Sequence, residues 1–233
     1  MFLFFFRLIF SIFYSILFIL QNIFFIVICG SLLVGTFGAL KQLRIKRFLA
    51  YASINQVGFI FFGLACGNIG GLVASLIYVF LYSTMSVVVF SIILQSEHLL
   101  TNKTVVYLSD FYTLESYSTK NLQYLIVAMF SMAGLPPLGG FVGKLLLYIV
   151  AIDSRLDFVV FFSLFLSIIS TFYYINFIHY LWFIKLNLAR LFFFNYDKLI
   201  NSILLSLVIC LLSFVILLPF CYATFYSLAF SCV

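Results

Sequence analysis

The chain has 233 residues, of which 66% are hydrophobic and only 8% are charged, and its mean hydropathy is +1.29. A soluble domain is about half apolar and a quarter charged, so this composition excludes a water-soluble globular protein. The formal net charge of +6 does not indicate a nucleic-acid partner, because the basic residues lie in short segments between long apolar runs, as in membrane proteins. We therefore expect an all-α integral membrane protein.

Apolar runs of spanning length recur along the chain and predict one transmembrane domain, 1–233, with about seven helices. In chain order the predicted spans are 3–20, ending at Gln21-Asn22, then 22–40, 47–66, 70–95, 121–151, 157–184 and 200–226. A basic segment, 41–47, separates the second and third spans, and Gly67-Asn68 separates the third and fourth. The polar segment 96–120 is the longest predicted loop.

Loop charge supports this count, because successive loops alternate between the two sides of the membrane. One side receives nine basic residues and the other receives Arg155 alone, beside Asp153 and Asp157. This asymmetry places the N-terminus on the positive side, which is the cytoplasm or the mitochondrial matrix, and the C-terminus on the opposite side. The nine are Lys41, Arg44, Lys46, Arg47, Lys103, Lys120, Lys185, Arg190 and Lys198.

The fifth predicted span is interrupted. Two consecutive prolines, Pro136 and Pro137, follow Gly134 within an apolar run. Prolines remove backbone donors and obstruct a helix. A helix break at membrane depth persists only where it is buried in protein or lines a wet cavity, and such breaks form ion sites in transporters. We therefore expect the segment 134–137 to belong to a functional site.

A lysine follows this break. Lys144 lies nine residues before Asp153, which is about 13 Å of helix and near mid-membrane. A charged side chain there costs at least about 2.5 kcal/mol, and a buried lysine gives up its proton more readily than an exposed one. We predict that Lys144 relays protons. The alternative is a lysine that snorkels along lipid, which the adjacent break disfavours.

Other candidates give weaker signals. His179 lies late in the sixth span, where it either relays protons or bonds a neighbouring carbonyl. Gln56 in the third span either contributes to a polar path through bridging water or hydrogen-bonds between helices. The five cysteines are scattered without metal-ligand spacing, so neither a metal site nor a disulfide framework is expected. They are Cys29, Cys66, Cys210, Cys221 and Cys232.

Two segments together resemble a known family. Residues 41–59 read KQLRIKRFLAYASINQVGF and residues 130–144 read FSMAGLPPLGGFVGK. They resemble the antiporter-like subunits of respiratory complex I, and the lysine after the Gly-x-Pro break is most similar to subunit 2 of NADH:ubiquinone oxidoreductase. The resemblance implies a proton-translocating membrane-arm subunit with Lys144 as a relay residue. Relatives often carry histidine where Gln56 stands, and glutamine cannot itself store a proton.

The resemblance also implies partners and a location. Such subunits typically have fourteen helices, and the seven expected here resemble the last seven, so the N-terminal half of subunit 2 is expected on a separate chain. Further expected partners are the other membrane-arm subunits and membrane lipids, including bound phospholipids. No cofactor is expected in this chain. The implied location is the mitochondrial inner membrane, with the N-terminus on the matrix side and the C-terminus on the intermembrane-space side.

Two other functions stay open at this point. The chain is alternatively a structural or assembly fragment of the complex with a silent pump, because the acidic and basic partners of the first half are missing. The second open function is that of a cation/proton antiporter subunit, since antiporters share the two motifs. Substitution of Lys144 separates these hypotheses.

Overall fold

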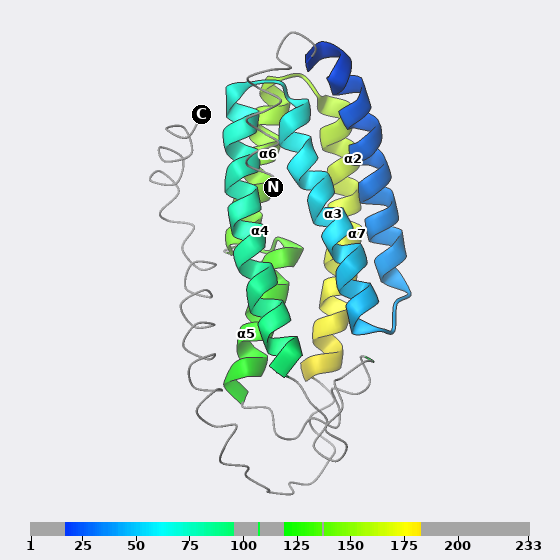
Figure 1. The fold of residues 1–233 in the computed structure, drawn as a ribbon, viewed down its shortest axis with the longest axis vertical. Coiled ribbons are helices and arrows are strands. Elements are labelled where there is room, and N and C mark those ends of the chain that lie inside the picture. Colours follow the sequence, from blue (N-terminus) through cyan, green and yellow to red (C-terminus); the bar gives the residue numbers. More distant parts are fainter. Residues whose placement is uncertain (1–16, 96–106, 108–118, 137, 183–233) are drawn as a thin grey trace, which may run out of the picture.

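A computed structural model describes residues 17–95, 107, 119–136 and 138–182 of the chain. Within these residues the fold is a bundle of helices that run along one long axis (Figure 1). The helices are α2 (Leu17–Leu40), α3 (Ile45–Ala65), α4 (Ile69–Gln95), α5 (Thr119–Ala133), α6 (Gly139–Asp153) and α7 (Asp157–Trp182). The prediction of an all-α membrane fold is confirmed for this part of the chain. The predicted span 200–226 and residues 3–16 of the first span lie outside the described residues.

Four of these helices are long and apolar enough to cross a membrane: α2, α3, α4 and α7. The remaining two, α5 and α6, have 15 residues each and follow one another along the bundle axis (Figure 1). Together they make up the predicted interrupted span, with the break at 134–138.

The predicted boundary at Gln21-Asn22 is wrong. Helix α2 passes through both residues and continues to Leu40 without interruption. The reason is tertiary, because the Gln21 side chain lies against Gly67 in the turn between α3 and α4, where the glycine adopts φ +67. An amide pair ends a helix only by weak propensity, and a contact of this kind overrides it.

Helix α3 lies at the centre of the bundle. About two thirds (67%) of its most apolar 18-residue stretch is buried inside the bundle, against 33–44% of the same stretch in the other three spanning helices. It packs closely on α2, where Gly35 faces the backbone of Asn55 and Gly38 faces the ring of Tyr51. A residue at the centre of the membrane on α3 therefore faces protein rather than lipid, which is where polar side chains are tolerated.

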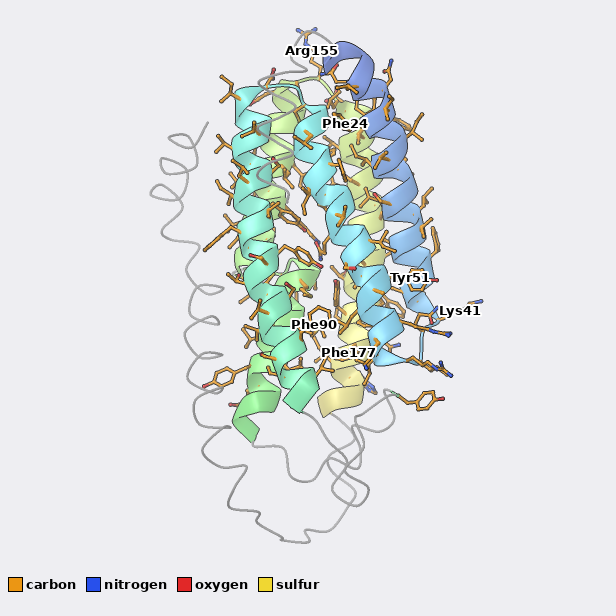
Figure 2. The ribbon with its side chains drawn as sticks, in the orientation of Figure 1. Phe24, Lys41, Tyr51, Phe90, Arg155 and Phe177 are labelled. Carbon is orange, nitrogen blue, oxygen red and sulfur yellow. The ribbon has the colours of Figure 1, made fainter. Side chains whose placement is uncertain are left out.

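The two ends of the bundle differ in charge. The basic turn 41–44 and the α6–α7 turn at 154–156 lie at opposite ends, as the positions of Lys41 and Arg155 show (Figure 2). Arg44 forms an isolated antiparallel bridge with Tyr107 and places its guanidinium 5.7 Å from that ring. Tyr107, which belongs to the predicted loop 96–120, therefore lies at the basic end of the bundle, in agreement with the predicted alternation of loops.

Candidate functional site

The break between α5 and α6 exposes two backbone carbonyls. In an uninterrupted helix the carbonyls of Met132 and Ala133 would accept hydrogen bonds from residues 136 and 137. Both of those residues are proline and carry no N–H. Gly134 turns the chain with φ +85, and its N–H donates to the Ser131 carbonyl at 3.0 Å. The two prolines therefore leave two acceptors in the middle of the bundle that other groups must satisfy.

Two side chains replace the missing donors. Gln56 on α3 donates through Nε2 to the Met132 carbonyl at 3.2 Å. Lys144 on α6 donates through Nζ to the Ala133 carbonyl, also at 3.2 Å. The break and the lysine predicted from the sequence thus form one hydrogen-bonded unit, and Gln56 belongs to it.

Lys144 is buried without a carboxylate partner in the described part of the chain. Its side chain is 5% exposed, and Nζ lies 4.9 Å from the centroid of the Phe59 ring. The acidic residues described are Asp153 and Asp157, at the exposed α6–α7 end of the bundle. One carbonyl dipole and one aromatic ring compensate a buried ammonium only in part.

The space for Lys144 depends on two glycines. A Cβ atom on Gly134 would lie 3.2 Å from Nζ of Lys144. Gly140 lies so close to Ser131 that a Cβ atom there would be 2.8 Å from the Ser131 carbonyl carbon and nearer still to its oxygen. The Gly140 N–H donates to Oγ of Ser131 at 3.2 Å. The ends of α5 and α6 therefore meet backbone to backbone and hold the lysine beside the break.

Gln56 connects the break to two further helices. Its Oε1 accepts a hydrogen bond from the Tyr78 hydroxyl of α4, and its Nε2 also donates to the Tyr174 hydroxyl of α7 at 3.3 Å. The adjacent residue of α3, Asn55, donates through Nδ2 to the hydroxyl of Tyr173 on α7 at 3.2 Å. Gln56 is 2% exposed, so these bonds form away from lipid and fix the orientation of its amide.

Sequence reasoning missed Tyr78, Tyr174 and Phe59. The chain has 15 tyrosines and 33 phenylalanines, and hydropathy treats both types as ordinary members of apolar runs. No local pattern distinguishes the three that contact Gln56 or Lys144. His179 does not join this cluster: it is exposed in the last turn of α7, five residues beyond Tyr174. In the described residues no three His, Cys, Asp or Glu side chains group as a metal site would require.

Comparison with known proteins adds the family. The profile described as "NADH:quinone oxidoreductase/Mrp antiporter, TM" matches residues 1–170. NADH-ubiquinone oxidoreductase chain 2 of Marchantia polymorpha is 36% identical over 163 residues, which cover 70% of this chain and 32% of the relative. NADH-quinone oxidoreductase subunit N of Paramagnetospirillum magneticum is 37% identical over 154 residues, which cover 66% of this chain and 31% of the relative. The aligned segment thus spans about a third of each relative.

Solved structures agree on the fold. A chain of respiratory complex I from Thermus thermophilus with bound aureothin superposes with a TM-score of 0.61 at 28% identity, covering 85% of this chain and 44% of that one. A chain of the Mrp complex from Dietzia sp. DQ12-45-1b gives a TM-score of 0.68 at 17% identity, covering 91% and 46%, which shows the fold alone. From the profile match over 170 residues and these relatives, the chain belongs to the NADH:quinone oxidoreductase/Mrp antiporter family of transmembrane subunits.

Proposed function

We propose that this chain is part of a proton-translocating membrane-arm subunit of respiratory complex I, corresponding to the C-terminal part of subunit 2, and that Lys144 takes up and releases the transported proton. The single observation that carries the proposal is the setting of Lys144. It is buried beside a helix break, bonded to a carbonyl that the break frees, and has no counter-ion among the described residues. The names of the aligned relatives support the same assignment.

In this proposal Lys144 alternates between two forms. As an ammonium it donates to the Ala133 carbonyl and lies over the Phe59 ring. As a neutral amine it keeps that donor bond and gains a lone pair that accepts the next proton. Because the site compensates the charge only in part, neither form is trapped. Gln56 cannot hold a proton, so its part is to orient the hydroxyls of Tyr78 and Tyr174 and any water that they bind.

The other assignments follow from the same proposal. Electron transfer would take place elsewhere in the complex, and this chain would carry no cofactor. The location is the mitochondrial inner membrane, with the basic turn 41–44 on the matrix side. A separate chain that supplies the N-terminal half, the neighbouring membrane-arm subunits and bound phospholipids are the proposed partners. Purification of the assembled complex, followed by identification of every chain and lipid that accompanies this one, tests them.

The central test substitutes Lys144 in the assembled complex. Lys144→Met keeps the apolar stem and removes the amine, and Lys144→Arg keeps a charged donor that does not release its proton near neutral pH. Lys41→Met is the matched control, because it removes an exposed lysine outside the site. We expect both Lys144 variants to decrease proton pumping per NADH oxidised by about tenfold or more, with the control unchanged. Normal pumping in both assembled variants would refute the proposal.

One observation favours a structural function as a second candidate. Lys144 and Gln56 stand in for the backbone donors that Pro136 and Pro137 lack, so they also stabilise the break. If that is their whole contribution, Lys144→Arg keeps the donor and pumps normally, whereas Lys144→Met decreases assembly without changing the protons moved per electron. The arginine variant therefore separates proton transfer from scaffolding. If the chain were instead a cation/proton antiporter subunit, proteoliposomes that contain it should exchange sodium for protons without NADH. We expect no such exchange.

A further inference from the structure

The face of the Phe59 ring meets the amine of Lys144. Nζ lies 4.9 Å from the ring centroid, within the distance of about 6 Å at which the negative face of an aromatic ring attracts a cation. Phe59 is fully buried on α3, so bulk water does not screen this attraction. The ring therefore offers the ammonium a partial negative charge at a depth where the described residues bring no carboxylate.

Two tyrosines hold the Phe59 ring in place. Tyr78 of α4 packs on it with centroids 6.0 Å apart and ring planes at 53°, and Tyr148 of α6 packs on it edge-on at 6.5 Å. Aromatic pairs are favourable at such separations when their rings are not stacked face to face. Because rings from two other helices pack on Phe59, its rotation is restricted and its face stays toward the amine.

Tyr78 is itself fixed by residues of the lysine site. Its hydroxyl donates to Oε1 of Gln56, and its ring lies so close to Gly143 that a Cβ atom there would be 2.8 Å from Cδ2 of the tyrosine. Gly143 directly precedes Lys144 on α6. The hydrogen bond of Gln56 therefore fixes Tyr78, which in turn fixes the ring that lies over the lysine.

Ordinary packing is the competing explanation for a buried phenylalanine on α3. Phe62, three residues further along the same helix, provides the comparison. It is also fully buried, and it also packs on Tyr148, with centroids 6.0 Å apart. The two phenylalanines thus share a helix, their burial and a tyrosine neighbour, but the ammonium lies over Phe59. A function that depends on the ring face should therefore be confined to Phe59.

We propose that the ring face of Phe59 binds the ammonium form of Lys144 and holds it beside the helix break, in place of the carboxylate of an ordinary buried ion pair. This inference rests on the proposed proton transfer through Lys144. Phe59 exchanges no proton itself. A side chain of similar volume without a π-face would fill the same space, but among the described residues it would leave the charged amine only the Ala133 carbonyl.

The first test needs no variant. A density map of the assembled complex that resolves side chains should show Nζ of Lys144 over the face of Phe59, within about 6 Å of the ring centroid. A lysine whose amine turns away from the ring, or a carboxylate of another chain bonded to that amine, overturns the inference.

The second test compares Phe59→Leu with Phe62→Leu in the assembled complex. Both remove a fully buried ring from α3, so both should lower the yield of complex by a similar amount. Only Phe59→Leu should also lower proton pumping per NADH oxidised, by about three- to thirtyfold, the factor that a cation–π contact with a desolvated cation supplies. Phe59→Met, whose unbranched side chain adapts to the same space, replaces the leucine variant if that variant does not assemble.

Aromatic replacements separate the ring face from the volume of the side chain. Phe59→Tyr and Phe59→Trp keep a π-face, so at least one of them should pump within about twofold of the wild type. Equal pumping in Phe59→Leu and Phe62→Leu, or a loss in both aromatic variants as large as in Phe59→Leu, overturns the inference.

Lys144→Met, measured beside these variants, distinguishes the inference from the proposed function. If Lys144→Met abolishes pumping and Phe59→Leu does not lower it, the proposed function stands and the inference about Phe59 fails. If Lys144→Met pumps normally, the proposed function fails and the inference fails with it.

Discussion

Replacement of Gly140 by alanine tests the close approach of α5 and α6 on which the lysine site depends. The new Cβ atom would lie 2.8 Å from the carbonyl carbon of Ser131 and 3.3 Å from Cε of Met85. The first neighbour is backbone and cannot rotate away, and its oxygen is nearer still, so the two helix ends must separate by about 1.5 Å to reach ordinary van der Waals contact. That movement also lengthens the bond from the Gly140 N–H to Ser131 Oγ, now 3.2 Å.

The expected cost combines two effects. Overpacking of a closely packed interior costs about 1–3 kcal/mol, and loss of one hydrogen bond adds about 0.5–1.5 kcal/mol. We expect Gly140→Ala to destabilise the bundle by about 2–4 kcal/mol, seen as a lower yield of assembled complex and a lower midpoint of thermal denaturation. Because the break would open, the Lys144 bond to the Ala133 carbonyl should weaken, and pumping per NADH in the remaining complex should fall.

Gly30→Ala is the matched control for this experiment. A Cβ atom on Gly30, in the interior of α2, meets nothing within 4 Å among the described residues. The same chemical change should therefore leave yield, denaturation midpoint and pumping unchanged. If Gly140→Ala matched Gly30→Ala in all three measurements, the contact between the two helix ends would not be required, and the reasoning about the break would be refuted.

Two further predictions concern the neighbours of the site and the membrane topology. Gln56→Leu leaves the Tyr78 hydroxyl and the Met132 carbonyl without partners, so we expect it to lower the free energy of unfolding by about 2–4 kcal/mol. The double variant Gln56→Leu/Tyr78→Phe should lose less stability than the two single variants added together. Strict additivity of the two losses would contradict the hydrogen bond between Gln56 and Tyr78. Lys41→Cys and Arg155→Cys, each in a cysteine-free background, should react with an impermeant thiol reagent from opposite sides of the membrane. Lys41→Cys should react from the matrix side. Labelling of both cysteines from one side would disprove the proposed orientation.

Much of the bundle was predictable from hydropathy and loop charge. The helices α3, α4 and α7 begin and end within a few residues of the predicted bounds, because lipid requires long uninterrupted apolar segments and every backbone group must find its partner inside them. The boundary at Gln21-Asn22 was not predictable in this way. Polar amides inside a helix are tolerated when another part of the fold covers them, and the contact of Gln21 with Gly67 arises from residues far apart in the chain.

The candidate site, like the bundle, was predictable only in part. The break could be inferred from the sequence, because proline removes backbone donors wherever it occurs, and the nine residues between Lys144 and Asp153 predict that the lysine lies inside the membrane. The packing of the helices was needed to show which groups satisfy the freed carbonyls of Met132 and Ala133, which aromatic ring lies over the lysine, and that His179 is exposed. Those contacts join helices that are distant in sequence. Hydropathy records only the solvent preference of each side chain, so it contains no information on which faces of two helices meet.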